Sequence, residues 1–272
     1  RSRKMKRPDD FSYSQSILQE YMDCQYRFFL RHIRKIEWPA VESEPVLLNQ
    51  EKMRVGQVFH RLVQQYFSGV DQSLLGDNIQ SPELAAWWQE FIALDLQNLP
   101  GEKYAEKTIS IPFNGFRLTA KYDLLVMMPK QKFTIYDWKT SSYLPKTTNL
   151  VGRLQSIVYP FVLRKSTAVQ MEAIDTLEEI EMIYWFPAHP TRPISFLYSN
   201  DRFLQDGDLL TGLLNEIVVN DEDWFTRTSD QSRCRYCRYR SHCGRGIDAG
   251  IVESGSEELL DESAFNLDFD AL

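Results

Sequence analysis

The stretch that decides the fold runs from Phe116 to Lys139 and reads F-R-L-T-A-K-Y-D-L-L-V-M-M-P-K-Q-K-F-T-I-Y-D-W-K. Both halves have the apolar, β-branched and aromatic character of strands, whose side chains alternate between two faces. The segment 129–131, Pro-Lys-Gln, separates the halves and predicts a hairpin turn. With Lys130 at the centre of that turn, Asp123 lies directly opposite Asp137.

The two aspartates of this hairpin need a positive group between them. Facing residues of an antiparallel pair have Cβ atoms about 4.5 to 5.5 Å apart. Two ionised carboxylates at about 5 Å repel by roughly 3 kcal/mol at an effective dielectric constant of about 20. A divalent cation such as Mg²⁺ or Mn²⁺ suits these hard oxygen ligands. Lys139, two residues after Asp137, projects from the same face. A slip of one residue in the register would turn one carboxylate away.

A helix is predicted upstream by M-R-V-G-Q-V-F-H-R-L-V-Q-Q-Y-F, residues 53–67, in which apolar residues recur at helical spacing. His60 lies at the edge of its apolar face, one turn after Gly56. The small Gly56 lets another segment approach closely, and His60 could then bind the metal through one imidazole nitrogen. A purely structural histidine is the alternative. Farther on, Gln155 and Tyr159 are four residues apart and share one face of a helix.

These segments resemble the PD-(D/E)XK nuclease superfamily, in particular its RecB-like branch. That branch carries a G-x-x-x-H helix, an x-x-x-D strand, a D-x-K strand and a Q-x-x-x-Y helix. All four motifs occur here in the same order: Gly56 and His60, then Asp123, then Asp137 and Lys139, then Gln155 and Tyr159. Two positions depart from the pattern. Ala120 replaces the usual glycine before the first aspartate, and Pro160 follows Tyr159, where it should kink the helix.

The resemblance implies an α/β fold with a restriction-endonuclease-like core, in which helices flank a mixed central sheet. It also implies that His60, Asp123 and Asp137 hold the catalytic metal, together with the backbone carbonyl of Trp138. Lys139 would orient or deprotonate the attacking water and stabilise charge on the phosphate. Gln155 and Tyr159 would steady the lysine or the nucleic-acid backbone.

Glu106 precedes the alternating segment T-I-S-I-P-F. It could add an outer carboxylate to the metal site. We favour the simpler interpretation, an exposed charge at the end of a strand.

The four cysteines form a second group, with Cys24 near the start and Cys234, Cys237 and Cys243 near the end. C-x-x-C is a poor structural disulfide and nothing indicates export, so metal binding is favoured. Structural zinc usually takes two close pairs of ligands, whereas three clustered thiols and one distant thiol favour an iron-sulfur cluster.

A subset of RecB-like nucleases has the same early cysteine and late C-x-x-C-x-x-x-x-x-C, which implies a [4Fe-4S] cluster that joins helical additions at the two ends of the domain. Its early motif usually reads C-P-x-x-F, and residues 24–28 here read C-Q-Y-R-F. Zinc remains the alternative. Because metal binding contributes folding free energy, loss of the cluster should destabilise the domain.

Further elements are predicted around these motifs. Ser81 and Pro82 begin a helix whose Trp87, Trp88, Phe91 and Leu94 are core residues. Strands are expected at 181–186 and 193–198, followed by a helix from about 202 to 219.

The 272 residues, 43% of them apolar, are enough for one large domain, which we place at 1–247. Residues 248–272 hold eight acidic and no basic residues and form an acidic, flexible tail. Without that tail the 31 basic residues balance 30 acidic ones. Basic segments at 31–35 and 233–240 are expected to form a phosphate-binding surface, with Tyr236 and Tyr239 available for base stacking. A solvated basic face is the alternative.

The resemblance implies a Mg²⁺- or Mn²⁺-dependent DNA nuclease, above all an exonuclease on single-stranded ends. A nuclease subunit of a CRISPR spacer-acquisition complex with an integrase partner, a silent DNA-end-binding scaffold and an RNA nuclease are the alternatives. No Walker A motif is present, so we expect no ATPase motor in this sequence, and a helicase is among the partners that the resemblance implies. No apolar run approaches the roughly 18 residues of a membrane span, and no secretory signal is evident, so we expect a cytoplasmic protein.

Overall fold

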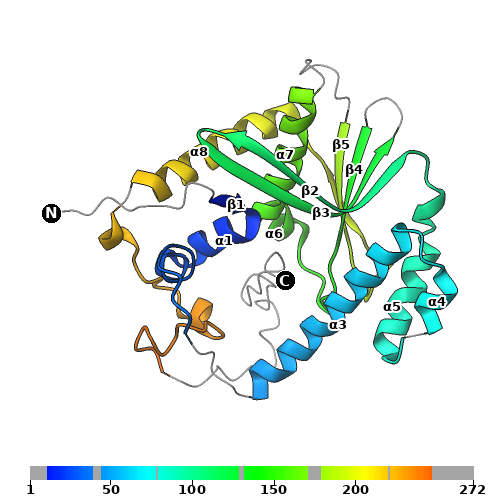
Figure 1. Cartoon of the computed structure of the whole chain (residues 1–272), viewed down its shortest axis with the longest axis horizontal. Coiled ribbons are helices and arrows are strands. Elements are labelled where there is room, and N and C mark those ends of the chain that lie inside the picture. Colours follow the sequence, from blue (N-terminus) through cyan, green and yellow to red (C-terminus); the bar gives the residue numbers. More distant parts are fainter. Residues whose placement is uncertain are drawn as a thin grey trace.

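The computed structural model describes residues 11–38, 44–77, 79–128, 132–170, 179–219 and 221–246. The predicted turn at 129–131 and the predicted tail at 248–272 lie outside these ranges. Within them the chain forms a six-stranded mixed sheet with helices on both faces, which confirms the predicted fold class (Figure 1). The strands are β1 (Ser12–Ser14), β2 (Glu102–Phe113), β3 (Phe116–Met128), β4 (Lys132–Trp138), β5 (Glu179–Trp185) and β6 (Ile194–Leu197).

The sheet is organised around β3. One edge of β3 pairs along its length with β2, in antiparallel fashion. The other edge carries β1, parallel, over the first part of β3 and β4, antiparallel, over the second part. β5 then pairs in parallel with β4, and β6 in antiparallel fashion with β5.

Helices surround this sheet. They are α1 (Gln15–Asp23), α2 (Gln25–Phe28), a π-helix (Phe29–Ile33), α3 (Glu44–Phe67), α4 (Gln72–Asp77), α5 (Pro82–Ala93), α6 (Thr147–Val151), α7 (Leu154–Gln170) and α8 (Asn200–Val219), with short 3₁₀ turns at Leu96–Asn98, Glu222–Trp224 and Gln231–Cys234. No helix in the described ranges has the length and apolar character needed to cross a bilayer.

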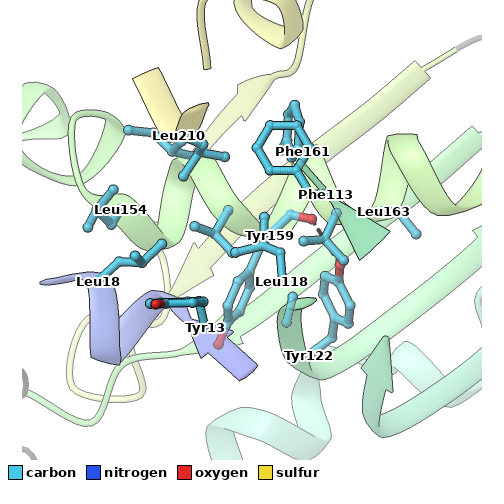
Figure 2. Close-up of a cluster of buried hydrophobic side chains, with 14 of the residues drawn as sticks. Tyr13, Leu18, Phe113, Leu118, Tyr122, Leu154, Tyr159, Phe161, Leu163 and Leu210 are labelled. Carbon is cyan, nitrogen blue, oxygen red and sulfur yellow. Dashed lines mark hydrogen bonds between the residues drawn. The ribbon is translucent and has the colours of Figure 1, made fainter. Parts of the chain in front are cut away.

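Two hydrophobic cores lie on opposite faces of the sheet. The α7-side core combines residues of α1, α7 and α8 with strand residues such as Leu118 and Tyr122 (Figure 2). The α3-side core combines residues of α3, α4 and α5 with Leu124 and Val126. In the second core Trp87, Trp88 and Phe91 are buried and Leu94 packs at the edge, as predicted. Ser81 accepts a hydrogen bond from the Leu84 N–H and begins α5, which Pro82 enters at its first position.

The predicted hairpin register is confirmed. Leu124 pairs with Tyr136, and the ladder continues in step to Met128 and Lys132. The ladder ends at the pair of Leu124 and Tyr136, and Asp123 and Asp137 are the next positions along the same register. Helix α7 runs through Pro160, and the carbonyl of Tyr159 accepts a hydrogen bond of 2.9 Å from the Tyr122 hydroxyl (Figure 2).

The position of Glu106 in the sheet corrects the sequence-based preference. Glu106 lies inside β2, between Ala105, which pairs with Leu124, and Lys107, which pairs with Tyr122. It therefore stands opposite Asp123 and is not at a strand end. Its φ of 52° is in the left-handed region, which costs a residue with a Cβ about 1–2 kcal/mol.

The strands change face at this same level. On β3, Tyr122 belongs to the α7-side core, but Leu124, two residues later, belongs to the α3-side core. Strict alternation would put both side chains on one face. The switch falls at Asp123, opposite the unusual backbone of Glu106, and the sheet is therefore locally distorted where its acidic residues gather.

The predicted close approach at Gly56 is present. A Cβ placed on Gly56 would lie 2.5 Å from Oγ1 of Thr140, the residue that follows Lys139. Glycine is thus required for α3 to contact the end of β4, and this contact brings His60 toward the hairpin.

Gly56→Ala should lower the unfolding free energy by about 1–3 kcal/mol through overpacking, although alanine is the better helix former. In a Thr140→Ala background the clash is removed, and the same change should no longer destabilise. Urea unfolding of the four proteins of this double-mutant cycle measures the coupling. Gly212→Ala in α8, where nothing lies within 4 Å, is the matched control and should stabilise by about 0.5–1 kcal/mol. Additive effects of Gly56→Ala and Thr140→Ala would contradict the inferred contact.

Candidate functional site

A compact group of metal-ligand side chains gathers at the distorted level of the sheet. His60 of α3, Glu106 of β2 and Asp123 of β3 offer ligand-type atoms that all lie within 4.8 Å of one another. Nδ1 of His60 is 3.3 Å from Oδ1 of Asp123. All three residues are partly buried. One imidazole nitrogen and two carboxylates suit Mn²⁺ or Mg²⁺, so the donor set fits a hard divalent cation.

Asp123 is held in the charged form that a metal ligand needs. Burial raises the pKa of its carboxyl group, but the neighbouring His60 and the hydrogen bond from the backbone N–H of Trp138 lower it, and the net shift is downward. The Trp138 N–H donates to Oδ2 of Asp123 over 2.8 Å. This contact uses the N–H of Trp138, and the metal-binding role expected for its carbonyl stays a prediction.

Asp137 belongs to a second group, on the α7 face of the sheet. Its Oδ2 is 2.8 Å from Nζ of Lys139, and its Oδ1 accepts a hydrogen bond of 2.5 Å from Nε2 of Gln155. Nζ of Lys139 also donates to Oε1 of Gln155 over 2.9 Å. The three side chains close a ring in which Gln155 fixes both the carboxylate and the amine.

Lys139 is oriented by its surroundings as well as by this ring. Its backbone N–H donates to the carbonyl of Trp185 on β5 over 2.9 Å, so the chain continues beside the sheet after β4 ends. Its Nζ lies 5.6 Å from the centre of the Tyr184 ring, within the range of cation–π attraction. The side chain is 12% exposed, which leaves the ammonium a limited path to solvent.

Tyr159 lies beside the second group and is buried. Burial, followed by the charges of Asp137 and Asp123, holds the pKa of its hydroxyl well above the usual value. The phenol is therefore neutral near pH 7 and can act as a hydrogen-bonding group, but not as a base.

The structure thus divides the predicted site residues between two groups. His60 and Asp123 come together in the first, and Asp137, Lys139 and Gln155 in the second. Asp137 is not a member of the compact His60, Glu106 and Asp123 group. The backbone of Trp138 connects the two groups, because its N–H binds Asp123 and its neighbours in sequence are Asp137 and Lys139.

Glu106 is the member of the compact group that sequence reasoning undervalued, and a local signal could have found it. Asn114 and Gly115 form an N-G pair between two strands, a strong hairpin signal. Both have positive φ, 50° and 80°, as a type I′ turn requires. Phe113 then pairs with Phe116, and counting back from that pair puts Glu106 opposite Asp123.

The four cysteines form a separate group beside α1 and α2. They interact electrostatically, because Cys24 and Cys234 each contribute to raising the pKa of both Cys237 and Cys243. Burial is the largest contribution and, with these neighbours, raises the pKa of Cys237 to about 11. Nη1 of Arg245 donates to Sγ of Cys234 over 2.8 Å. Four converging thiols with a nearby cation fit a metal cluster with thiolate ligands.

Backbone contacts also fasten the late cysteine segment to the early helices. The N–H of Tyr26 donates to the carbonyl of Thr226 over 3.0 Å, and the rings of Phe29 and Phe225 stack with centroids 5.1 Å apart. In Figure 1 the orange segment that bears the late cysteines accordingly lies next to the dark blue helices.

The predicted basic surface near the cysteines needs correction. Tyr239 is 1% exposed, and its hydroxyl donates to the carbonyl of Ile36, so it is not available for base stacking. Arg34 pairs with Glu222, and Arg240 donates to the carbonyl of Arg245. Arg34 thus neutralises a carboxylate, and Arg240 satisfies a backbone carbonyl of the irregular segment that bears the late cysteines. Much of the positive charge is therefore used internally.

Gln155→Leu tests the ring on the α7 face. The change leaves Asp137 without its amide donor and Lys139 without its amide acceptor, and should lower the unfolding free energy by about 1–3 kcal/mol. Gln89→Leu on the exposed side of α5 is the control and should stay within about 0.5 kcal/mol of the parent. Urea denaturation gives both values. Equal effects of the two substitutions would show that the ring adds no stability.

The chain is similar to known proteins in its sequence profile and in its fold. The profile of the PD-(D/E)XK nuclease superfamily matches residues 12–244. The crystal structure of an inferred exonuclease from Eubacterium rectale is similar over 84% of this chain and 88% of its own, with a TM-score of 0.53 and 12% identity. The structure of SSO0001 covers 70% of this chain and 84% of its own, with a TM-score of 0.31 and 12% identity. A search of the curated proteins finds no match. Because the profile match covers most of its length, the chain belongs to the PD-(D/E)XK nuclease superfamily.

Proposed function

We propose that this protein is a Mg²⁺- or Mn²⁺-dependent deoxyribonuclease that degrades single-stranded DNA from its ends. One observation carries the proposal: the group of His60, Glu106 and Asp123 lies beside the ring of Asp137, Lys139 and Gln155, and the Trp138 backbone joins them. A metal site next to an oriented amine can activate a water molecule and stabilise charge on a phosphodiester, the two needs of its hydrolysis.

His60, Glu106 and Asp123 would hold the metal, with Asp137 and the carbonyl of Trp138 as further ligands. A bound Mg²⁺ or Mn²⁺ supplies Lewis acidity toward a phosphate oxygen and lowers the pKa of a coordinated water. The lowered pKa of Asp123 keeps that carboxylate ionised for this task.

Lys139 would act on the attacking water and on the negative charge of the phosphate. Its ammonium is placed by Asp137 and Gln155, so it can orient the attacking water and offset negative charge on the phosphate. Gln155 holds Lys139 in place, and the neutral Tyr159 hydroxyl supports Gln155 from the same helix.

The preference for ends and for DNA is supported by resemblance. The motif order matches RecB-like nucleases, and the Eubacterium rectale protein of similar fold is described as an exonuclease. RNA cleavage, internal cleavage and silent DNA binding are outcomes that the substrate test distinguishes.

We also propose that Cys24, Cys234, Cys237 and Cys243 hold a [4Fe-4S] cluster with a structural role. Four thiolates carry negative charge, and Arg27 and Arg245 are the cations whose own pKa values respond to these thiols. The cluster would join α1 and α2 to the segment near residue 240, which is remote in sequence.

The first prediction from this function concerns Lys139. In Mn²⁺, the anaerobically purified protein should degrade 5′-labelled and 3′-labelled linear single-stranded DNA and leave circular DNA intact. Lys139→Ala should reduce cleavage at least about a hundredfold, in the range expected for loss of an acid–base group, while DNA binding persists. Lys107→Ala, which removes an exposed lysine from β2, should retain the parent activity.

Each other result has a defined meaning. Cleavage of circles would make the enzyme an endonuclease, and cleavage of RNA alone would change the substrate. Binding without cleavage by the parent protein would favour a scaffold. Undiminished cleavage by Lys139→Ala would remove this lysine from the mechanism.

The second prediction concerns the cysteines. Cys24→Ser should remove most of the iron and the absorbance near 400 nm, and should lower the unfolding free energy by at least about 2 kcal/mol, because the clamp between distant segments is lost. Met22→Ser, at an exposed position two residues earlier, should change neither property. Metal analysis that finds one zinc ion and no iron would replace the cluster by a zinc site.

A further inference from the structure

Lys121 is a cation that no step of the proposed reaction uses, and it contacts the candidate metal site directly. Its Nζ lies 2.9 Å from Oε2 of Glu106, one of the three residues of the compact group. It precedes Asp123 by two residues on β3. The Lys121 side chain is 38% exposed and that of Glu106 is 18% exposed, so the ion pair is in partial contact with solvent.

The other carboxylate of the group has fixed partners. Asp123 has His60 on one oxygen and the Trp138 N–H on the other, and neither partner carries a long flexible stem. Glu106 is instead paired with an ammonium on four rotatable carbons. Of the two carboxylates, Glu106 is therefore the one whose present counterion can leave without a change in the backbone.

A divalent cation and the Lys121 ammonium compete for Glu106. A metal ion bound to this carboxylate would stand a few ångströms from Nζ, and like charges at that distance repel strongly in a partly buried site. The exposed stem of Lys121 gives the ammonium room to move away. A phosphodiester oxygen of a substrate bound at the metal would be an anion that can replace Glu106 as its partner.

We propose that Lys121 is an exchangeable counterion that passes from Glu106 to the DNA backbone when the metal binds. This inference rests on the proposed metal-dependent nuclease function. It adds that binding of the metal ion and binding of DNA are coupled. Without metal, Lys121 neutralises Glu106 and weakens metal binding. With metal, Lys121 is released to bind a phosphate group. Metal and single-stranded DNA therefore bind cooperatively, and the coupling is reciprocal.

The first test is metal binding without DNA. Mn²⁺ is titrated into the full chain and the free ion is counted by its electron paramagnetic resonance signal. Lys121→Met should tighten Mn²⁺ binding about two- to fivefold, the factor expected when a partly exposed ion pair no longer competes. Lys121→Arg, which keeps the charge, should stay near the parent. Lys107→Met removes an equal charge from the neighbouring position on β2 and should have little effect.

The second test is DNA binding without cleavage. Affinity for a fluorescent single-stranded oligonucleotide is compared in EDTA and in Ca²⁺, a hard cation used as a probe. Parent protein and Lys107→Met should bind more tightly in Ca²⁺. Lys121→Met should lose most of this gain, and Lys121→Arg should keep part of it. A lysine that only supports the fold is not expected to weaken Mn²⁺ binding and at the same time increase the gain in DNA affinity in Ca²⁺.

Two results would overturn the exchange. One is a Lys121→Met protein that matches Lys107→Met in both assays, and the other is tighter Mn²⁺ binding with an unchanged gain in DNA affinity. Glu106→Gln separates this failure from failure of the proposed function. If the parent binds Mn²⁺ and Glu106→Gln weakens that binding about tenfold or more, the metal site stands whatever Lys121 does. If the parent binds no Mn²⁺, the metal site itself is wrong.

Discussion

The structure depends on how two neighbouring carboxylates are compensated at the centre of the sheet. Asp123 and Asp137 occupy the positions next to the last pair of the β3–β4 ladder, and their mutual repulsion would destabilise the hairpin if both lacked counterions. Asp123 is met by His60 and a backbone N–H, and Asp137 by Lys139 and Gln155. These partners come from α3, from the end of β4 with the residue that follows it, and from α7, so all three segments must be in place before the hairpin is electrostatically stable.

Two of the groups that compensate the aspartates come from helices that pack in different cores. His60 belongs to α3, which packs with the α3-side core, and Gln155 belongs to α7 in the other core. The left-handed backbone at Glu106 is a cost in stability that accompanies this arrangement. Such a cost is tolerated where surrounding packing determines the conformation, as two buried cores do here.

The hairpin register, the role of Gly56 and the grouping of the cysteines were accessible from sequence, because each follows from a local rule about turns, side-chain size or ligand type. Glu106 was missed because its value depends on the register of a second hairpin and on a φ angle that sequence does not signal.

Tyr239 was misjudged for a related reason. Its Y-C-R-Y-R setting indicates charge, but only the tertiary packing shows that the irregular segment uses its own arginines and tyrosine to satisfy backbone carbonyls.

The cysteine region and the candidate active site are connected through β3. Strand β1, which leads directly into α1, pairs in parallel with β3 at Arg117 to Thr119, a few residues before Lys121 and Asp123. Helix α1 is tied to α2 by the buried pair of Glu20 and Arg27, 3.1 Å apart, and Asp23 binds Arg233 of the late segment over 2.7 Å. Buried ion pairs add little net stability but penalise alternative arrangements that would leave one charge unpaired. These pairs therefore fix where the cysteine-bearing segments sit relative to β1, and through β1 they constrain the strand that carries Asp123.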